Sequence, residues 1–525
     1  MLEAMSTMTD FQYYFICLIL CFLSTILIKS FFNKPIKPIT TLCLPPSPPA
    51  LPVIGHLHLL SSSLSKSLHN LSTKYGPLLL VRFGASRMLV VSSASMATEI
   101  FKTHDLTFAS RPSFAFADEL PYGNLGFFAT PYGEYWRFMK KLCMTELLSP
   151  KQIERSRAIR HGEVAKFLRK MLESATRKEM VDVGAELMRL TNNSICRMAM
   201  STSCSENGEE AEKIRELVKE SFELAAKVCF GDVLGPLKRL GFWVYGKQLI
   251  DVTMGYDKLL EGMLKQHEER AEREGWDRED KDLMDILLKA YQDDKAEVKI
   301  SRTHVKAFLL DLFIGGTATT AEVMQWAVAE LINHPNIFNK LRAEIKSVVG
   351  SRLVEESDVG NLTYLQAVIK ETLRLHPPVP LSTRESRQAC KIKEFDIPEK
   401  TAVAINQYAI MRDPELWDNP DDFRPERFLS PDEKADGEMN QNEARGQNFQ
   451  YIPFGSGRRR CPGSNLATIL LNTSIAAMVQ CFDWKVGNGN EGKVNMQVGA
   501  GMSLPMAHPL ILLPVDHFNP FASST

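Results

Sequence analysis

One cysteine lies in a loop whose residue types fit a metal-binding thiolate. The loop runs from 454 to 463, reads Phe-Gly-Ser-Gly-Arg-Arg-Arg-Cys-Pro-Gly, and contains Cys461. Its first two glycines permit tight backbone geometry that a Cβ would obstruct. An apolar helix is predicted directly after Gly463, and the partial positive charge of a helix N-terminus favours thiolate over thiol. Because a thiolate can donate electron density to haem iron, Cys461 is predicted to be the axial ligand of such an iron, with Arg459 beside a propionate.

A long helix is predicted from Thr303 to His334, and it contains two adjacent glycines followed by hydroxyl side chains. The central stretch reads Gly-Gly-Thr-Ala-Thr-Thr and runs from 315 to 320. A glycine inside a helix costs about 1 kcal/mol relative to alanine. Its presence twice in succession therefore indicates a close approach by another group or a local distortion of the helix.

A charged pair lies on another predicted helix, where Glu371 and Arg374 are three residues apart. This spacing places both side chains on one helix face. Such pairs are common at protein surfaces, so the spacing alone indicates little, and the position of the pair relative to later motifs matters more. It precedes Arg427, which in turn precedes the cysteine loop.

The elements that must position these residues are mostly helical. Two short strands are predicted, from 78 to 84 and from 88 to 92, around a turn. Beyond about residue 135 the periodicity is helical, and the charged run from 268 to 282 is typical of a solvated helix end and loop. The polar stretch from 430 to 447 is interpreted as a surface loop. The predicted fold is mainly α with a small β-rich lobe.

Composition limits the class of partner and the compartment. The chain has 525 residues, a net charge of −1, 44% hydrophobic residues and 24% charged residues, so nothing in its balance favours nucleic acid. Its ten cysteines show no metal-type pairing or disulfide framework. A reducing compartment is therefore the simpler interpretation.

The N-terminus is predicted to be a membrane anchor. Residues 11 to 28 carry no charge, and about 20 residues are enough to cross a bilayer core. The lysines that follow place the rest of the chain in the cytosol by the positive-inside rule. A cleaved signal peptide would need a basic start and a small-residue cleavage site, and neither is clear. The predicted organisation is an anchor from 1 to 32, a basic and proline-rich hinge from 33 to 55, and a catalytic domain from 56 to 525.

The cysteine loop resembles the haem-binding signature of cytochromes P450, Phe-x-x-Gly-x-Arg-x-Cys-x-Gly, at every fixed position. With the proline-rich hinge and the Tyr-Trp-Arg helix, the chain is similar to plant microsomal cytochromes P450. It resembles groups related to flavone and isoflavone synthases and to oxidases of triterpenes such as friedelin. The resemblance implies the cytochrome P450 fold with haem b. It also implies electrons from NADPH through NADPH-cytochrome P450 reductase, a possible cytochrome b5 partner, and a single-pass anchor in the endoplasmic reticulum membrane.

The resemblance also assigns roles to individual residues. Glu371, Arg374 and Arg427 would form a buried structural charge network. Thr319 would order water and help to protonate iron-bound dioxygen. The residue before it is usually acidic in the family but is Ala318 here, so a water chain, a substrate hydroxyl or Glu322 would have to replace that acid.

Haem contacts and a docking surface follow from the same resemblance. Trp136 and Arg384 match positions at the haem edge, and Lys140 stands where the family has an arginine. Lysine can still meet a propionate, but only as a point charge. A basic rim made by Lys140, Lys141 and Arg458 would help to dock an acidic electron donor.

The implied function is monooxygenation of a lipophilic plant metabolite, most simply a triterpenoid or related terpenoid, with successive oxidation of one methyl group as an option. The alternatives are a flavonoid substrate, an oxygen-independent isomerase or dehydratase, and an inactive haem-binding sensor or scaffold. A bulky, poorly soluble substrate would need a largely apolar pocket. The residues predicted to line it are Phe114, Phe128, Gly315, Val379, Ser382, Met502 and Leu504.

Overall fold

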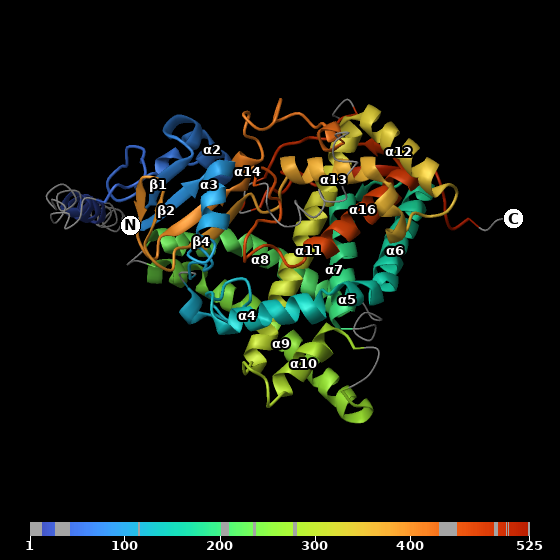
Figure 1. The fold of residues 1–525 in the computed structure, drawn as a ribbon, viewed down its shortest axis with the longest axis horizontal. Helices are drawn as coiled ribbons and strands as arrows, with labels where there is room; N and C mark the ends of the chain where they lie inside the picture. Colours follow the sequence, from blue (N-terminus) through green and yellow to red (C-terminus); the bar gives the residue numbers. More distant parts are fainter. Residues whose placement is uncertain are drawn as a thin grey trace, which may run out of the picture.

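Helices make up most of this computed structural model (Figure 1). The structure describes residues 13–26, 42–113, 116–200, 209–234, 238–276, 281–429, 449–487, 492–499, 501 and 503–522. Its labelled helices are α2 (Leu64–Tyr75), α3 (Ala94–Thr98), α4 (Glu134–Leu142), α5 (Pro150–Arg155), α6 (Arg157–Arg177), α7 (Val183–Met200), α8 (Glu209–Leu234), α9 (Lys238–Glu274), α10 (Leu283–Gln292), α11 (Arg302–Asn333), α12 (Pro335–Val349), α13 (Thr363–Leu375), α14 (Gln407–Ile410) and α16 (Ser464–Cys481).

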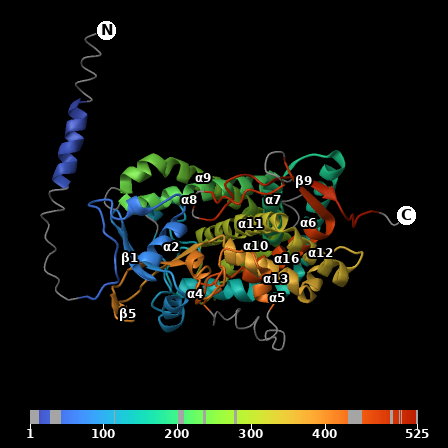
Figure 2. The same cartoon turned by 90° about the horizontal axis from the view of Figure 1, so that it is seen from above.

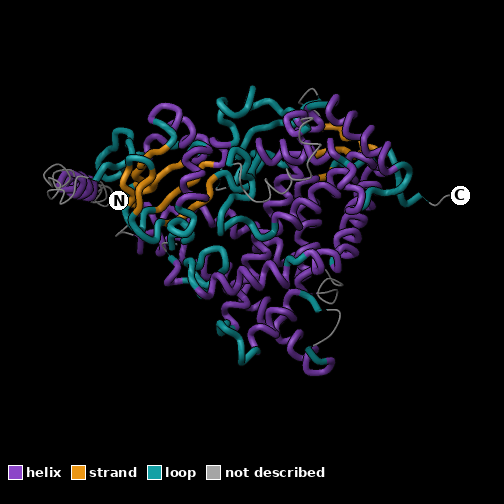
Figure 3. Tube along the Cα trace, viewed as in Figure 1, coloured by secondary structure: helices purple, strands orange, loops and turns teal. Residues whose placement is uncertain are grey.

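The strands gather in two places, a larger sheet near the N-terminal part and a smaller one near the C-terminus (Figure 3). The larger sheet has the order β1-β2-β7-β4, in which β2 and β7 are parallel and the other pairs antiparallel. The smaller sheet has the order β3-β9-β8, and β5 pairs with β6. Their bounds are β1 (Leu78–Phe83), β2 (Ser86–Val91), β3 (Val181–Asp182), β4 (Leu381–Glu385), β5 (Cys390–Ile392), β6 (Phe395–Ile397), β7 (Ala402–Asn406), β8 (Phe482–Val486) and β9 (Ile511–Asp516).

The central helix α11 begins and ends where its sequence provides stop signals. Ser301 caps its N-terminus in a capping box with His304, and Pro335 begins the next helix directly after it. The helix is continuous through Gly315 and Gly316, so of the two predicted alternatives, close approach or distortion, the distortion does not occur. A Cβ on Gly316 would lie 2.8 Å from the Ile195 side chain of α7, so this glycine allows the two helices to pack closely.

Two hydrophobic cores flank α11, which contributes residues to both and is therefore apolar on most sides. One core joins α11 to α6, α7, α12, α13 and α16, and the other joins it to α7, α8, α9 and α10. The helix that follows the cysteine loop, α16, thus packs against the same central helix that carries the predicted catalytic threonine.

The N-terminal segment differs from the rest because its apolar side chains are exposed. Residues Tyr13–Ile26 form an apolar helix that lies away from the remaining body (Figure 2). Among the described helices, Arg302–Asn333 is long and apolar enough to cross a membrane, but most of it is buried as the core helix α11. In the predicted hinge, the described part from residue 42 onward packs on the β-rich lobe, since Leu80 N donates to Pro46 O at 2.9 Å.

Candidate active site

The cysteine loop is held in a tight conformation by its own backbone. Cys461 N donates to Phe454 O at 3.0 Å, which closes the loop on itself. Gly455 and Gly457 have φ values of 66° and 67°, in the left-handed region that favours glycine. A Cβ on Gly457 would also lie 2.5 Å from Asp105 Oδ1, so glycine is needed there for space as well as for conformation.

The surroundings of the Cys461 thiol show two features. The residue is exposed, yet burial by surrounding protein raises the pKa of its thiol. Smaller opposing effects come from the N–H of Gly463, which contacts the sulfur, and from the positive charges of Lys140 and Arg460. The thiol therefore lines an internal space, and deprotonation at neutral pH requires more positive charge than the protein itself provides, such as a bound metal ion.

Three guanidinium groups lie together in the interior close to this loop. Arg384 on β4 is 2% exposed, and burial together with the charges of Arg111 and Arg459 lowers its pKa well below the usual value. Burial and the Arg111 charge likewise lower the pKa of Arg459 to about 9. Guanidinium groups that are buried together and repel one another favour a bound anion between them.

Two donors in this region lack a partner among the described residues. They are Nε of Arg111 and Nε1 of Trp136, and both atoms are buried. Trp136 stacks on Phe127 with ring centroids 5.5 Å apart, and the guanidinium of Arg459 lies 4.5 Å from the Trp136 ring. The predicted residues Trp136, Arg384 and Arg459 thus belong to one cationic cluster with free hydrogen-bond donors.

The donors of Arg459 itself are directed to the backbone. Its Nε donates to Ala109 O at 2.7 Å, its Nη2 to Thr130 O at 2.6 Å and its Nη1 to Phe127 O at 3.4 Å. Arg459 therefore ties the cysteine loop to the segment before α4. Its predicted contact with a propionate is not among these contacts and stays a prediction.

Two of the three residues predicted to form a basic rim, Lys140 and Arg458, have partners within the protein. Lys140 Nζ donates to Arg460 O at 3.2 Å, so its ammonium contacts the cysteine loop, and burial lowers its pKa. Arg458 forms an ion pair with Asp105 at 3.0 Å. Of the three residues predicted for donor docking, Lys141 is exposed and forms no ion pair within the described part of the chain.

One face of α11 opens on interior space. Gly315 is exposed although its neighbours in the helix are buried or half-buried, and a Cβ on it would meet nothing within 4 Å. Residues spaced by four and seven positions share a helix face, so Asp311 and Glu322 lie on this face with Gly315. Thr319 borders it, and its Oγ1 donates to Gly315 O at 2.6 Å.

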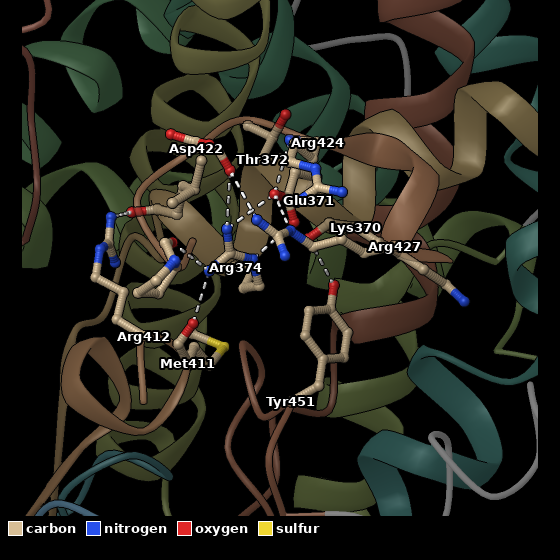
Figure 4. Close-up of polar contacts among 12 residues, drawn as sticks. Lys370, Glu371, Thr372, Arg374, Met411, Arg412, Asp422, Arg424, Arg427 and Tyr451 are labelled. Atoms are coloured by element: carbon tan, nitrogen blue, oxygen red, sulfur yellow. Dashed lines mark hydrogen bonds and ion pairs between the residues drawn. The ribbon is translucent and has the colours of Figure 1, made fainter. Parts of the chain in front are cut away.

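Glu371 and Arg374 form a buried ion pair near the end of α13 (Figure 4). Nε of Arg374 donates to Oε2 of Glu371 at 2.7 Å, Nη2 donates to Oε1 at 2.8 Å, and both side chains are 0% exposed. Arg427 joins the pair through an Nε contact of 3.1 Å to Oε1 of Glu371. The other donors of Arg374 reach the backbone carbonyl groups of Met411, Pro420 and Asp422.

A tyrosine connects this network to the segment that leads into the cysteine loop. Tyr451 Oη donates to Lys370 O at 3.2 Å, next to Glu371 (Figure 4). Tyr451 lies ten positions before Cys461 in the sequence. The structure therefore brings the three predicted network residues together and joins them to the segment that precedes the predicted iron ligand.

The residues predicted to line a substrate pocket fall into several environments. Phe128 and Val379 are exposed apolar side chains, and Ser382 is buried with no partner for its Oγ in the described part of the chain. Leu504 is buried, and its carbonyl accepts from Trp326 Nε1 at 2.7 Å. The two remaining candidates, Phe114 and Met502, lie outside the described residues. A separate hollow between the C-terminal strands is lined by other residues, among them Val494, Met506 and Leu512.

Two half-buried charged residues of the site, Arg111 and Asp311, were not among the predicted ones. Arg111 lies over the Phe128 ring, 3.8 Å from its centroid, and belongs to the cationic cluster. Asp311 accepts the N–H of Phe128 at 2.9 Å. The available signal was the presence of a charged residue within an apolar stretch, at Arg111 before Phe116 and at Asp311 within the central helix.

Comparison with known proteins agrees with this geometry. Residues 45–511 match the family model described as Cytochrome P450. The chain belongs to the cytochrome P450 family. A zebra fish cytochrome P450 structure with abiraterone has a TM-score of 0.70 and 24% identity, covers 86% of this chain and is itself covered to 99%, which confirms the predicted fold.

Several curated plant proteins are similar to this cytochrome P450 over nearly their whole length. Cytochrome P450 705A22 of Arabidopsis thaliana is 46% identical over 97% of this chain and 98% of its own. Beta-amyrin 24-hydroxylase of Glycine max is 43% identical over 98% of this chain and 100% of its own. The 3,9-dihydroxypterocarpan 6A-monooxygenase of Glycine max is 43% identical over 91% of this chain and 94% of its own. This cytochrome P450 is accordingly an oxidoreductase, a monooxygenase of plant specialised metabolism.

The cofactor of this cytochrome P450 is haem, and the residues present fit it. Cys461 offers an accessible sulfur to iron, and the cationic cluster with its unpartnered Trp136 and Arg111 donors fits the two propionates, which are anions. When bound, thiolate-ligated haem activates dioxygen for insertion into a C–H bond. Cys461 would supply the ligand, and the cationic cluster would supply the counter-charges.

Proposed function

We propose that this cytochrome P450 hydroxylates a triterpenoid or related terpenoid, with electrons from NADPH delivered by NADPH-cytochrome P450 reductase. One oxygen atom enters a C–H bond of the substrate, the other leaves as water, and NADPH supplies the two electrons. The observation that carries the oxidation chemistry is the Cys461 thiol, which faces internal space beside a cationic cluster.

Similarity to a triterpene-oxidising relative and the apolar character of the predicted pocket residues support a terpenoid substrate. The beta-amyrin 24-hydroxylase, whose name gives the triterpene beta-amyrin as its substrate, is similar over nearly the full length of both chains. Phe128 and Val379 present apolar surface, which suits a rigid hydrocarbon skeleton. Successive oxidation of one methyl group would use the same site, because the alcohol product remains lipophilic.

A flavonoid substrate is the second candidate, since the pterocarpan 6A-monooxygenase is similar to a comparable degree. Substrate discrimination by pocket shape rests on small energies, about 1–3 kcal/mol for one methylene group. The two substrate classes must therefore be separated by a direct assay.

Microsomes that contain the full-length chain and a plant reductase are expected to convert triterpenes, with NADPH, into products with one or more added oxygen atoms. The assay is a panel of triterpenes and flavonoids analysed by mass spectrometry. Microsomes without the chain, and complete microsomes without NADPH, are the controls. Conversion of flavonoids alone would contradict the terpenoid assignment, and rearranged products formed without NADPH would instead identify an isomerase or dehydratase.

The N-terminal helix is proposed to anchor the enzyme in the endoplasmic reticulum membrane by a single pass, with the catalytic body in the cytosol. Its exposed apolar side chains and the lysines that follow support this orientation. We expect the full-length chain to remain in the membrane pellet after alkaline carbonate extraction, and a chain that begins at residue 33 to be extracted. Equal retention of both chains would show that residues 1–32 are not the anchor.

A further inference from the structure

The open face of α11 carries two carboxyl groups, one on either side of Gly315. Asp311 lies one turn before this glycine and Glu322 two turns after it, at helix spacings that share a face. Monooxygenation consumes two protons in each turnover, because one oxygen atom of dioxygen leaves as water. A proton donor on this face would be positioned to supply them.

Asp311 is committed to the backbone. It accepts the N–H of Phe128 at 2.9 Å and is also bonded by the N–H of Phe127. Burial raises its pKa to about 6, against the effects of these N–H groups and of the Arg111 charge. At neutral pH the group is therefore mostly ionised, and its oxygens hold the segment at Phe128 against α11.

Glu322 lies in a different environment. Its Oε1 accepts the hydroxyl of Ser503 at 3.0 Å, whereas its Oε2 is buried with no partner in the described part of the chain. Burial, opposed only by the Ser503 hydrogen bond, raises its pKa to about 8. The carboxyl group thus keeps its proton at neutral pH, and a protonated carboxyl group can donate that proton.

Thr319 is the group that can hold a water molecule beside Glu322. Its hydroxyl hydrogen is used in the bond to Gly315 O, so its oxygen lone pairs remain to accept a hydrogen bond from that water. The Cα–Cβ bond of a helical residue is tilted toward the N-terminus, which directs the Glu322 side chain over the turn that contains Ala318 and Thr319. Ala318 is buried in a hydrophobic core and supplies no competing acid beside the threonine.

We propose that Glu322, held by Ser503, is the proton-donating residue of the reaction and acts through a water molecule that donates a hydrogen bond to the Thr319 hydroxyl oxygen. The proton leaves a carboxyl oxygen of Glu322 for this water, the water passes one of its own protons to the oxygen atom that departs as water, and solvent returns a proton to the carboxylate. This inference rests on the monooxygenase activity and not on the terpenoid substrate proposed above.

The first test measures the protonation state of Glu322 directly and does not require turnover. In the infrared spectrum of the holoenzyme at pH 7, the carbonyl band of a buried protonated carboxyl group is expected to disappear in Glu322→Gln. The band should remain in Glu173→Gln, an exposed glutamate on α6. It should also be lost as the pH rises through about 8, because the group then ionises. A wild-type spectrum without a band that depends on Glu322 would overturn the proposal.

The second test uses whichever compound the enzyme converts, so that an error in the substrate class does not affect it. Glu322→Gln is expected to lower product formed per NADPH oxidised by about 100-fold, the lower end of the range that general acids contribute. Hydrogen peroxide should increase correspondingly, and Glu322→Asp should restore part of the coupling. Substrate affinity, measured by the binding difference spectrum, should stay unchanged. Normal coupling in Glu322→Gln, or weaker substrate binding with normal coupling, would overturn the proposal.

Discussion

Replacement of Cys461 by serine is expected to remove the bound pigment and reduce turnover to background. A serine hydroxyl stays protonated at neutral pH and cannot supply the thiolate that the iron requires. A loss of 10³-fold or more in turnover would correspond to about 4 kcal/mol of transition-state stabilisation. The measurement is the absorption spectrum of purified protein, together with turnover of a converted substrate.

The matched control for this change is Cys390→Ser, which alters a half-buried thiol on β5. It is expected to keep the pigment and the activity. Thermal unfolding should show that Cys461→Ser still folds, so that loss of pigment reflects loss of the ligand. A serine variant that retains normal haem absorption and activity would exclude Cys461 as the axial ligand.

Removal of the charge on Glu371 is expected to destabilise the protein by about 3–5 kcal/mol, because Glu371→Gln leaves buried arginine charge without its counter-charge. Arg374 is fully enclosed, and Arg427 shares the same carboxylate. Urea unfolding followed by circular dichroism measures the change. We also expect weaker retention of haem, since Tyr451 joins this network to the segment leading into the cysteine loop.

A second glutamate–arginine pair with the same spacing provides the control. Glu154 and Arg157 are also three residues apart, with a contact of 3.1 Å, but both side chains are largely exposed. Solvent screens such pairs, so Glu154→Gln should change stability by less than about 1 kcal/mol. Equal effects of the two substitutions would show that burial of the Glu371 network does not contribute to stability.

Local sequence signals were sufficient for several elements. The two strands predicted from 78 to 84 and from 88 to 92 are observed at Leu78–Phe83 and Ser86–Val91. The predicted helix from 303 to 334 is observed at Arg302–Asn333, since a capping serine and a following proline fix its ends. These signals depend on neighbours in the chain, so a single sequence contains them.

Features that depend on distant contacts could not be predicted in the same way. The two glycines of α11 predicted either a close approach or a distortion, and the contact of Gly316 with Ile195 on another helix decides between them. The association of Arg111 with Arg384 and Arg459 joins three segments far apart in the chain. The bonds of Arg459 to three carbonyl groups likewise require the folded backbone of the segment before α4.

The concentration of like charge around Arg384 has a consequence for how the enzyme matures in the cell. In a folded chain without haem, these arginine charges repel one another and have no bound anion between them. The propionates of haem would neutralise them, so binding of the cofactor stabilises the native state. Enzyme abundance should therefore follow the rate of tetrapyrrole supply, and chains made in excess of it should be degraded.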